Sequence, residues 1–144
     1  MVHLRAVSAP VYQARQPAVF WHHLAMGIVG LDHVQFTLPA GAEAEADRFY
    51  VSLLGFEVEE KPPILAARGG RWYRSGAARF HLGVDPSFTP ATRSHPAFVV
   101  ESLEALAEVL TRSGHPVEWD DLVEGVTRCY VRDPFGNRLE LIGA

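Results

Sequence analysis

One order of predicted elements occurs twice in this chain, with a spacing of about 59 residues. Each copy starts with a strand-like alternating segment, continues with a helix-like segment that ends at a glycine, and closes with three short strand-like segments. The first copy has these segments at 31–39, 42–55, 56–61, 69–76 and 78–85, and the second at 94–101, 102–114, 117–121, 127–134 and 138–143. The helix-ending glycines, Gly55 and Gly114, are separated by this repeat length. This duplication predicts an α+β fold built from two βαβββ modules.

The domain boundaries follow from this repeat and from a change in composition. No acidic residue precedes Asp32, so we interpret residues 1–28 as an N-terminal extension outside the core. An organelle transit peptide is the less favoured alternative, because serine is scarce in this segment. Residues 29–144 then form a single domain, with module one at 29–85, a turn-rich linker at 86–93 and module two at 94–144.

The overall composition excludes several classes of protein. The chain is 48% hydrophobic and 21% charged, as globular proteins are, and it lacks the roughly 18 consecutive apolar residues that a membrane span needs. Its net charge of −4 offers no cationic surface for nucleic acid. The single cysteine, Cys129, cannot form an internal disulfide. We therefore expect a cytoplasmic protein with neither a nucleic-acid nor a membrane partner.

Four side chains with metal-binding chemistry occupy corresponding places in the two copies. His81 and Glu140 lie on the last strands, separated by the repeat length, and His33 and His95 lie on the first strands at slightly more than that spacing. In each strand the apolar residues alternate onto the other face, so all four side chains are expected on the side of the sheet away from the helices. If the two sheets meet about a pseudo-twofold axis, the four groups converge. Imidazole and carboxylate donors suit a divalent Fe, Mn, Ni, Co or Zn ion. A polar pocket without metal is the alternative, because a single strand histidine is more often structural.

Three segments carry a resemblance to a known family: DHVQFTLP at 32–39, RFYVSLLGFEV at 48–58 and DPFGNRLELIG at 133–143. Over residues 29–143 the chain resembles the vicinal oxygen chelate superfamily, which includes glyoxalase I, extradiol dioxygenases, and fosfomycin- and bleomycin-resistance proteins. The resemblance implies a curved mixed sheet around a cleft, the glyoxalase/bleomycin resistance/dihydroxybiphenyl dioxygenase-like fold. It also implies a metal site formed by His33, His95 and Glu140. His81 stands where glyoxalase I has a metal-bound glutamate, so we expect it to be a fourth ligand or a general base.

These observations predict a metal-dependent enzyme whose small substrate chelates the ion through two adjacent oxygens. The reaction would be that of a glyoxalase-like lyase or isomerase, or of an extradiol-type dioxygenase, with His81 and Glu140 as catalytic residues. The alternative function is a non-catalytic drug- or metabolite-binding protein of the bleomycin-resistance type. Strand parity suggests the following substrate contacts: Gln35, Trp72, Arg74 and Tyr130.

A homodimer is expected, because two βαβββ modules leave sheet edges that need to be covered. The repeat brings the same four side-chain types together whether the cleft forms within one chain or between two swapped chains. The sequence therefore leaves these two arrangements open.

Overall fold

The computed structural model describes residues 27–144, and residues 31–144 of the chain form one compact unit. Almost all of the expected N-terminal extension, including His22 and His23, lies outside the described residues. Over the part that the structure describes, no helix is both long and apolar enough to cross a membrane.

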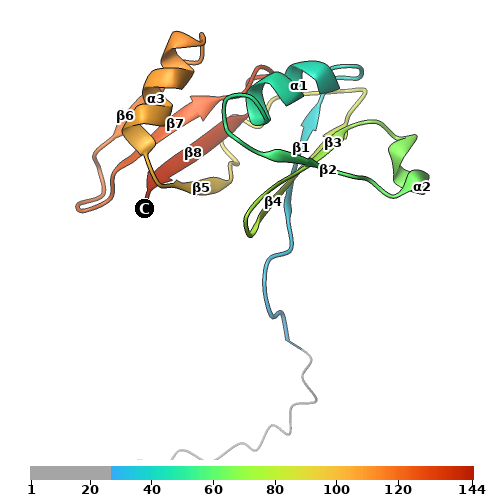
Figure 1. The fold of residues 1–144 in the computed structure, drawn as a ribbon, viewed down its shortest axis with the longest axis horizontal. Helices are drawn as coiled ribbons and strands as arrows, with labels where there is room; N and C mark the ends of the chain where they lie inside the picture. Colours follow the sequence, from blue (N-terminus) through green and yellow to red (C-terminus); the bar gives the residue numbers. More distant parts are fainter. Residues whose placement is uncertain (1–26) are drawn as a thin grey trace, which may run out of the picture. The chain divides into compact units, whose positions relative to one another are not determined.

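Each predicted module forms its own four-stranded mixed sheet with one principal helix (Figure 1). Module one comprises β1 (Val34–Leu38), α1 (Glu43–Tyr50), β2 (Glu57–Glu59), α2 (Pro63–Ala66), β3 (Arg71–Ser75) and β4 (Ala78–Val84). Module two comprises β5 (Ala97–Val100), α3 (Leu103–Arg112), β6 (Glu118–Asp120), β7 (Arg128–Arg132) and β8 (Arg138–Gly143). The sheet orders β1-β4-β3-β2 and β5-β8-β7-β6 are the same topology used twice, with the first and last strands of each module parallel. The βαβββ prediction is confirmed, and the short α2 is an additional element.

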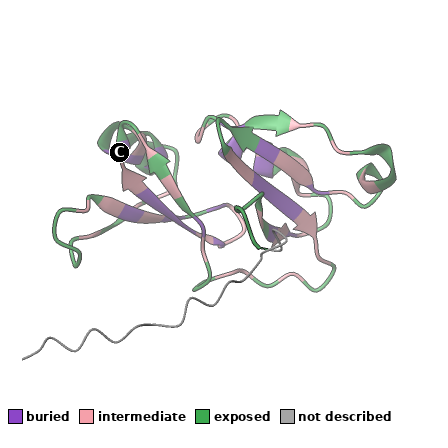
Figure 2. Cartoon of the chain, turned by 90° about the horizontal axis from the view of Figure 1, so that it is seen from below, coloured by how far each residue is buried: buried purple, intermediate pink, exposed green. Residues whose placement is uncertain are grey.

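Alternation along the last strand of each module separates a helix-covered face from an open face. Phe80 and Leu82 of β4, and Leu139 and Leu141 of β8, are almost fully buried in the hydrophobic core. Figure 2 shows that buried residues are concentrated in the sheets and on the helices. Successive side chains of a strand point to opposite faces, so the residues between these pairs point away from the core. His81 and Glu140 are those residues.

The two principal helices begin and end close to the predicted positions. Gly55 and Gly114, which follow α1 and α3, have φ values of 75° and 89°, in the left-handed region that terminates helices. Ser102 occupies the N-cap position of α3, but its side chain makes no capping hydrogen bond. Burial of the apolar side of each helix therefore contributes more to its position than capping does.

A buried hydrogen-bond network joins the two modules. The Tyr50 hydroxyl, at the end of α1, donates to Asp133 Oδ2 at 2.9 Å. The Asn137 side-chain amide donates to the other module at Thr37 O (3.0 Å) and to Asp133 Oδ2 (2.8 Å). Burial raises the pKa of both Tyr50 and Asp133, because the charged forms lose hydration. The Phe98 ring also contacts Phe56 and Phe80 across the module boundary, so the modules share one core.

Candidate functional site

In module one, three aromatic rings stack across neighbouring strands on the open face of the sheet. His81, on the central strand β4, stacks on His33 with ring centroids 4.0 Å apart and on Trp72 with centroids 4.4 Å apart. His81 is only 4% exposed, and its Nε2 atom is buried without a hydrogen-bond partner. Burial, reinforced by the nearby His33, lowers the pKa of His81, so its ring is neutral at pH 7. A buried imidazole nitrogen without a hydrogen-bond partner can bind a metal ion or exchange a proton in the tautomer that leaves its lone pair free.

The His33 ring is oriented by the residue that precedes it. Its Nδ1 atom lies 2.8 Å from Asp32 Oδ1, and a carboxylate can only accept, so Nδ1 carries the proton. Asp32 is itself held by Arg79, whose Nη1 donates to Oδ2 at 3.0 Å. The hydrogen bond from His33 and the charge of Arg79 lower the pKa of Asp32. This arrangement leaves the lone pair of His33 on Nε2, as metal-binding histidines require.

In module two, His95 faces Glu140. His95 Nδ1 lies 2.6 Å from the carbonyl oxygen of Arg93, which fixes the proton on Nδ1. His95 Nε2 lies 3.0 Å from Glu140 Oε2, and Glu140 is only 8% exposed. A nitrogen and a carboxylate oxygen this close need either a proton on the nitrogen, donated in a hydrogen bond, or a metal ion that both atoms bind.

An arginine occupies the other oxygen of this carboxylate. Arg128 Nη1 donates to Glu140 Oε1 at 3.1 Å, while its Nε and Nη2 donate to Asp120 Oδ1 at 3.2 and 3.0 Å. Arg128 lowers the pKa of Asp120 through this contact. Glu140 therefore forms an ion pair with Arg128 of the same chain without any metal ion.

The four predicted ligands form two pairs in this structure, His33 with His81 and His95 with Glu140. Among residues 27–144, no three His, Cys, Asp or Glu side chains come together in a group that could hold a metal ion. Each module thus presents half of the predicted ligand set.

The four predicted substrate-contact residues lie on the open faces. The strand register places Gln35 and Trp72 opposite His81, and it places Tyr130 opposite Glu140. Arg74 shares the face of Trp72, and its Nε donates to the carbonyl oxygen of Gly76 at 3.1 Å. The structure thus places Gln35, Trp72 and Tyr130 beside a predicted ligand, whereas Arg74 lies opposite Arg79.

Several polar residues near these pairs were not among the predicted site residues: Asp32, Glu118, Asp120, Arg128, Arg132 and Arg138. The repeat spacing contains a signal for some of them. Glu59 and Glu118 are separated by the same repeat length as the two helix-ending glycines, and so are Arg79 and Arg138. The repeat spacing that relates His81 to Glu140 therefore also points to Glu118 and Arg138.

Comparison with known proteins gives the family. Residues 30–141 match the model of the Glyoxalase/Bleomycin resistance protein/Dioxygenase superfamily. The chain belongs to this superfamily, and the fold predicted from its sequence is confirmed. A solved structure from Bacillus anthracis, described as that of a glyoxalase family protein, is 43% identical with a TM-score of 0.78, covering 81% of this chain and 96% of that one.

More distant structures share the fold. The fosfomycin resistance protein FosX from Listeria monocytogenes is 16% identical with a TM-score of 0.66, covering 82% of this chain and 95% of its own. Lactoylglutathione lyase from Agrobacterium tumefaciens is 21% identical with a TM-score of 0.58, covering 76% of this chain and 91% of its own. A search of curated proteins found no significant match. The superfamily includes enzymes, and its members commonly use a divalent metal ion.

Proposed function

We propose that this protein is a metal-dependent enzyme of the glyoxalase and dioxygenase superfamily, with His33, His81, His95 and Glu140 as its ligand set. The observation that carries the proposal is the hydrogen bonding of the three imidazole rings. His33 and His95 lie just before the first strands and not on them as predicted, and each donates its Nδ1 proton to an oxygen acceptor. The buried Nε2 of His81 has no hydrogen-bond partner. Histidine ligands oriented through Nδ1 are the usual arrangement at protein metal sites.

The chemistry follows from this donor set. A bound divalent ion would act as a Lewis acid on two adjacent oxygens of a small substrate. His81 is neutral at pH 7, so it can serve as a fourth ligand or accept a proton from the substrate. Trp72 covers one face of the His81 ring and excludes water there. Lyase, isomerase and dioxygenase reactions are all compatible with these roles.

We further propose that the complete site forms between two copies of the chain, with the pair His33–His81 of one copy meeting the pair His95–Glu140 of the other. This arrangement would explain why, within residues 27–144 of one copy, no three metal-binding side chains come together. The edge strand β5 supports a homodimer, because Val99 is 72% exposed beside an apolar groove of about 980 Å³. An open strand edge next to apolar surface is typical of an interface.

Metal content tests the proposal directly. We expect near-stoichiometric Fe, Mn, Ni, Co or Zn by elemental mass spectrometry of the gently purified protein. Glu140→Gln should lower metal affinity by about 100-fold or more, because loss of even an outer-shell partner costs 10–100-fold. His115→Gln, which changes a histidine outside the ligand set, should retain the metal. Equal metal content in Glu140→Gln and the unmodified protein would contradict the assignment.

A second variant separates the two roles of His81. If His81 is a ligand, His81→Gln loses metal; if it is a base, the variant keeps its metal and loses turnover.

Mixing two inactive variants tests the shared site. One variant carries His33→Ala and His81→Gln, and the other carries His95→Ala and Glu140→Gln. Unfolded and refolded together, they form mixed dimers in which one of the two sites has all four ligands, so metal binding returns in part. Each variant refolded alone is the control. No recovery in mixed dimers would contradict a site shared between copies.

The ion pair between Arg128 and Glu140 favours a second function. Because Arg128 already neutralises the Glu140 carboxylate, this side chain needs no metal ion, which is compatible with a non-catalytic binding protein of the bleomycin-resistance type. Stoichiometric binding of a small aromatic compound by protein that takes up none of the five metals would favour this alternative.

A further inference from the structure

Two arginines lie directly opposite each other on adjacent strands of module two. The register of β7 and β8 pairs Arg132 with Arg138, and like charges at directly opposed positions repel. Among the described residues, neither guanidinium lies within salt-bridge distance of a carboxylate. This pair therefore carries positive charge that no side chain in direct contact neutralises.

Module one contains the corresponding pair, and there one of the two arginines, Arg79, is neutralised by carboxylates. Arg74 and Arg79 are directly opposite on β3 and β4. Two hydrogen bonds link Arg79 to the Glu59 carboxylate, at 2.7 and 3.2 Å, and a third links it to Asp32 at 3.0 Å. Carboxylate oxygens thus occupy the positions beside Arg79 that a ligand could otherwise fill.

Module two differs at both carboxylate positions. Ser94 precedes His95 where Asp32 precedes His33, so one acid is missing. Glu118 lies opposite Tyr130 as Glu59 lies opposite Trp72, but Glu118 makes no ion pair with Arg138. The Arg138 guanidinium instead lies on the Tyr130 ring, 3.7 Å from its centroid. Stacking on a ring holds a guanidinium while leaving its N–H groups free to donate.

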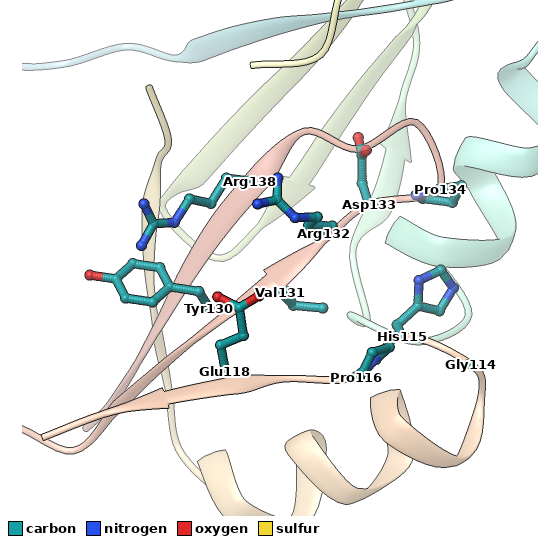
Figure 3. Close-up of a pocket in the computed structure, with 10 residues that line it drawn as sticks. All are labelled: Gly114, His115, Pro116, Glu118, Tyr130, Val131, Arg132, Asp133, Pro134 and Arg138. Atoms are coloured by element: carbon teal, nitrogen blue, oxygen red, sulfur yellow. The ribbon is translucent and has the colours of Figure 1, made fainter. Parts of the chain in front are cut away.

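Both arginines line a pocket of about 320 Å³ (Figure 3). Arg132, Arg138 and Tyr130 reach it from β7 and β8, and His115 lines it from the loop after α3. Two carboxylates also line it, but Asp133 accepts hydrogen bonds from Tyr50 and Asn137. Glu118 remains as the one exposed acid in the lining. The volume is within the range of pockets that bind small molecules.

We propose that this pocket binds an oxyanion, a carboxylate or phosphoryl group of a small ligand, between Arg132 and Arg138. The bound oxygens would occupy the role that Glu59 and Asp32 have beside Arg79 in module one. Guanidinium groups suit this task, because their N–H donors match the oxygen spacing of both carboxylate and phosphate.

The pocket is next to the proposed metal half-site. Tyr130 lies opposite Glu140, and the His95 ring contacts the Tyr130 ring edge-to-face with centroids 5.5 Å apart. Arg138 and Glu140 are next-but-one neighbours on one face of β8, which corresponds to about 7 Å. If the proposed metal function is also correct, the substrate carries an anionic group in addition to its chelating oxygens.

The test is an NMR titration of the full chain, kept metal-free with a chelator, at constant ionic strength set with chloride. Inorganic phosphate and acetate are the probes, and binding to either supports the pocket while distinguishing the two anions. We expect saturable shifts at Tyr130, Arg132 and Arg138. Arg138→Gln should weaken binding roughly tenfold, because a charged hydrogen bond is lost. Arg48→Gln, on the exposed surface of α1, is the matched control.

Glu118→Gln provides a test of opposite sign. Removing the exposed carboxylate from the lining should strengthen anion binding several-fold. If Arg138→Gln also disturbs folding through the lost stack on Tyr130, the exposed Arg132→Gln carries the same test. Saturable shifts that are absent, or that are equal in Arg138→Gln and Arg48→Gln, would overturn the proposal. Because the titration uses metal-free protein, a negative result would not affect the proposed metal site. Conversely, a protein that takes up no metal could still bind an anion in this pocket.

Discussion

The two modules share one scaffold but use its open face differently. In module one, Arg79 of the cross-strand arginine pair is held by two carboxylates of the same chain, and His81 is enclosed between two other rings. In module two the corresponding arginines line a pocket, and the residue at the position of His81 is Glu140, held by Arg128. The arginine of the last strand is therefore paired with acids in module one, as Arg79, and has no carboxylate partner in module two, as Arg138.

This difference shows how a duplicated fold can divide the parts of one site. Strand register keeps the positions equivalent, because Glu59 and Glu118 occupy matching places opposite an aromatic residue of the neighbouring strand. One change of residue before the first strand, from Asp32 to Ser94, removes a carboxylate beside the histidine. The stack of Arg138 on Tyr130 then replaces the ion pair that Arg79 makes. Divergence of the halves has left module two with the groups that can recognise an anion.

Loss of the hydrogen bond between Tyr50 and Asp133, which joins the two modules, should have the largest effect on stability. Tyr50→Phe removes a buried hydroxyl that donates to Asp133, and we expect a loss of about 2 kcal/mol in the free energy of unfolding. Tyr73→Phe is the matched control, since the Tyr73 hydroxyl donates at 2.8 Å to the half-exposed Asp47 within module one. Urea denaturation of the three proteins measures the difference. An equal loss in both variants would show that the contact between modules has no special weight.

The same variant has a defined pH dependence. Burial raises the pKa of Asp133, so the folded protein retains this proton to a higher pH than the unfolded chain does. The contribution of Asp133 to stability is therefore largest at low pH and declines as the pH rises through its folded pKa. The Tyr50 hydrogen bond is stronger to the carboxylate than to the neutral acid. The penalty of Tyr50→Phe should consequently grow as the pH rises through the raised folded pKa of Asp133, and a penalty independent of pH would contradict this account.

Much of the fold could be predicted from the sequence, because strand alternation reports burial. The alternation of Phe80 and Leu82 with His81, and of Leu139 and Leu141 with Glu140, correctly predicted which side chains point away from the helices. The glycine stops and the segment spacing predicted the two modules. In contrast, alternation did not predict α2, which follows from the fixed φ of Pro63 at the start of a four-residue turn.

The arrangement of the site was less accessible to sequence reasoning. Alternation places a residue on a face, but it does not say which faces meet, so it could not predict that the ligands would lie in two pairs. Long charged side chains reach several neighbours from one backbone position. Register alone could not decide whether Arg138 would pair with Glu118 or stack on Tyr130, and the structure shows the stack.

A smaller effect is expected at the acid that precedes the first histidine of module one. Asp32→Asn weakens the acceptor that fixes the Nδ1 proton of His33 and removes one partner of Arg79. If His33 binds a metal, we expect a loss of about tenfold in metal affinity, as for other partners of metal-bound histidines. A competition titration against a coloured chelator measures this change. Asp85→Asn, which changes an acid just after β4 that accepts from the backbone of Ser87, is the control and should leave the affinity unchanged.

The reciprocal change, Ser94→Asp, gives module two the carboxylate that module one has before its first histidine. If the open arginines bind an oxyanion, an aspartate at this position competes with it, as Asp32 occupies Arg79 in module one. We expect phosphate affinity to fall by a few-fold, since the side chain is exposed and solvent screens the interaction. Ser94→Asn, of the same size without the charge, should leave the affinity unchanged. Equal phosphate affinities of Ser94→Asp and Ser94→Asn would show that an acid at position 94 has no influence on anion binding in this pocket.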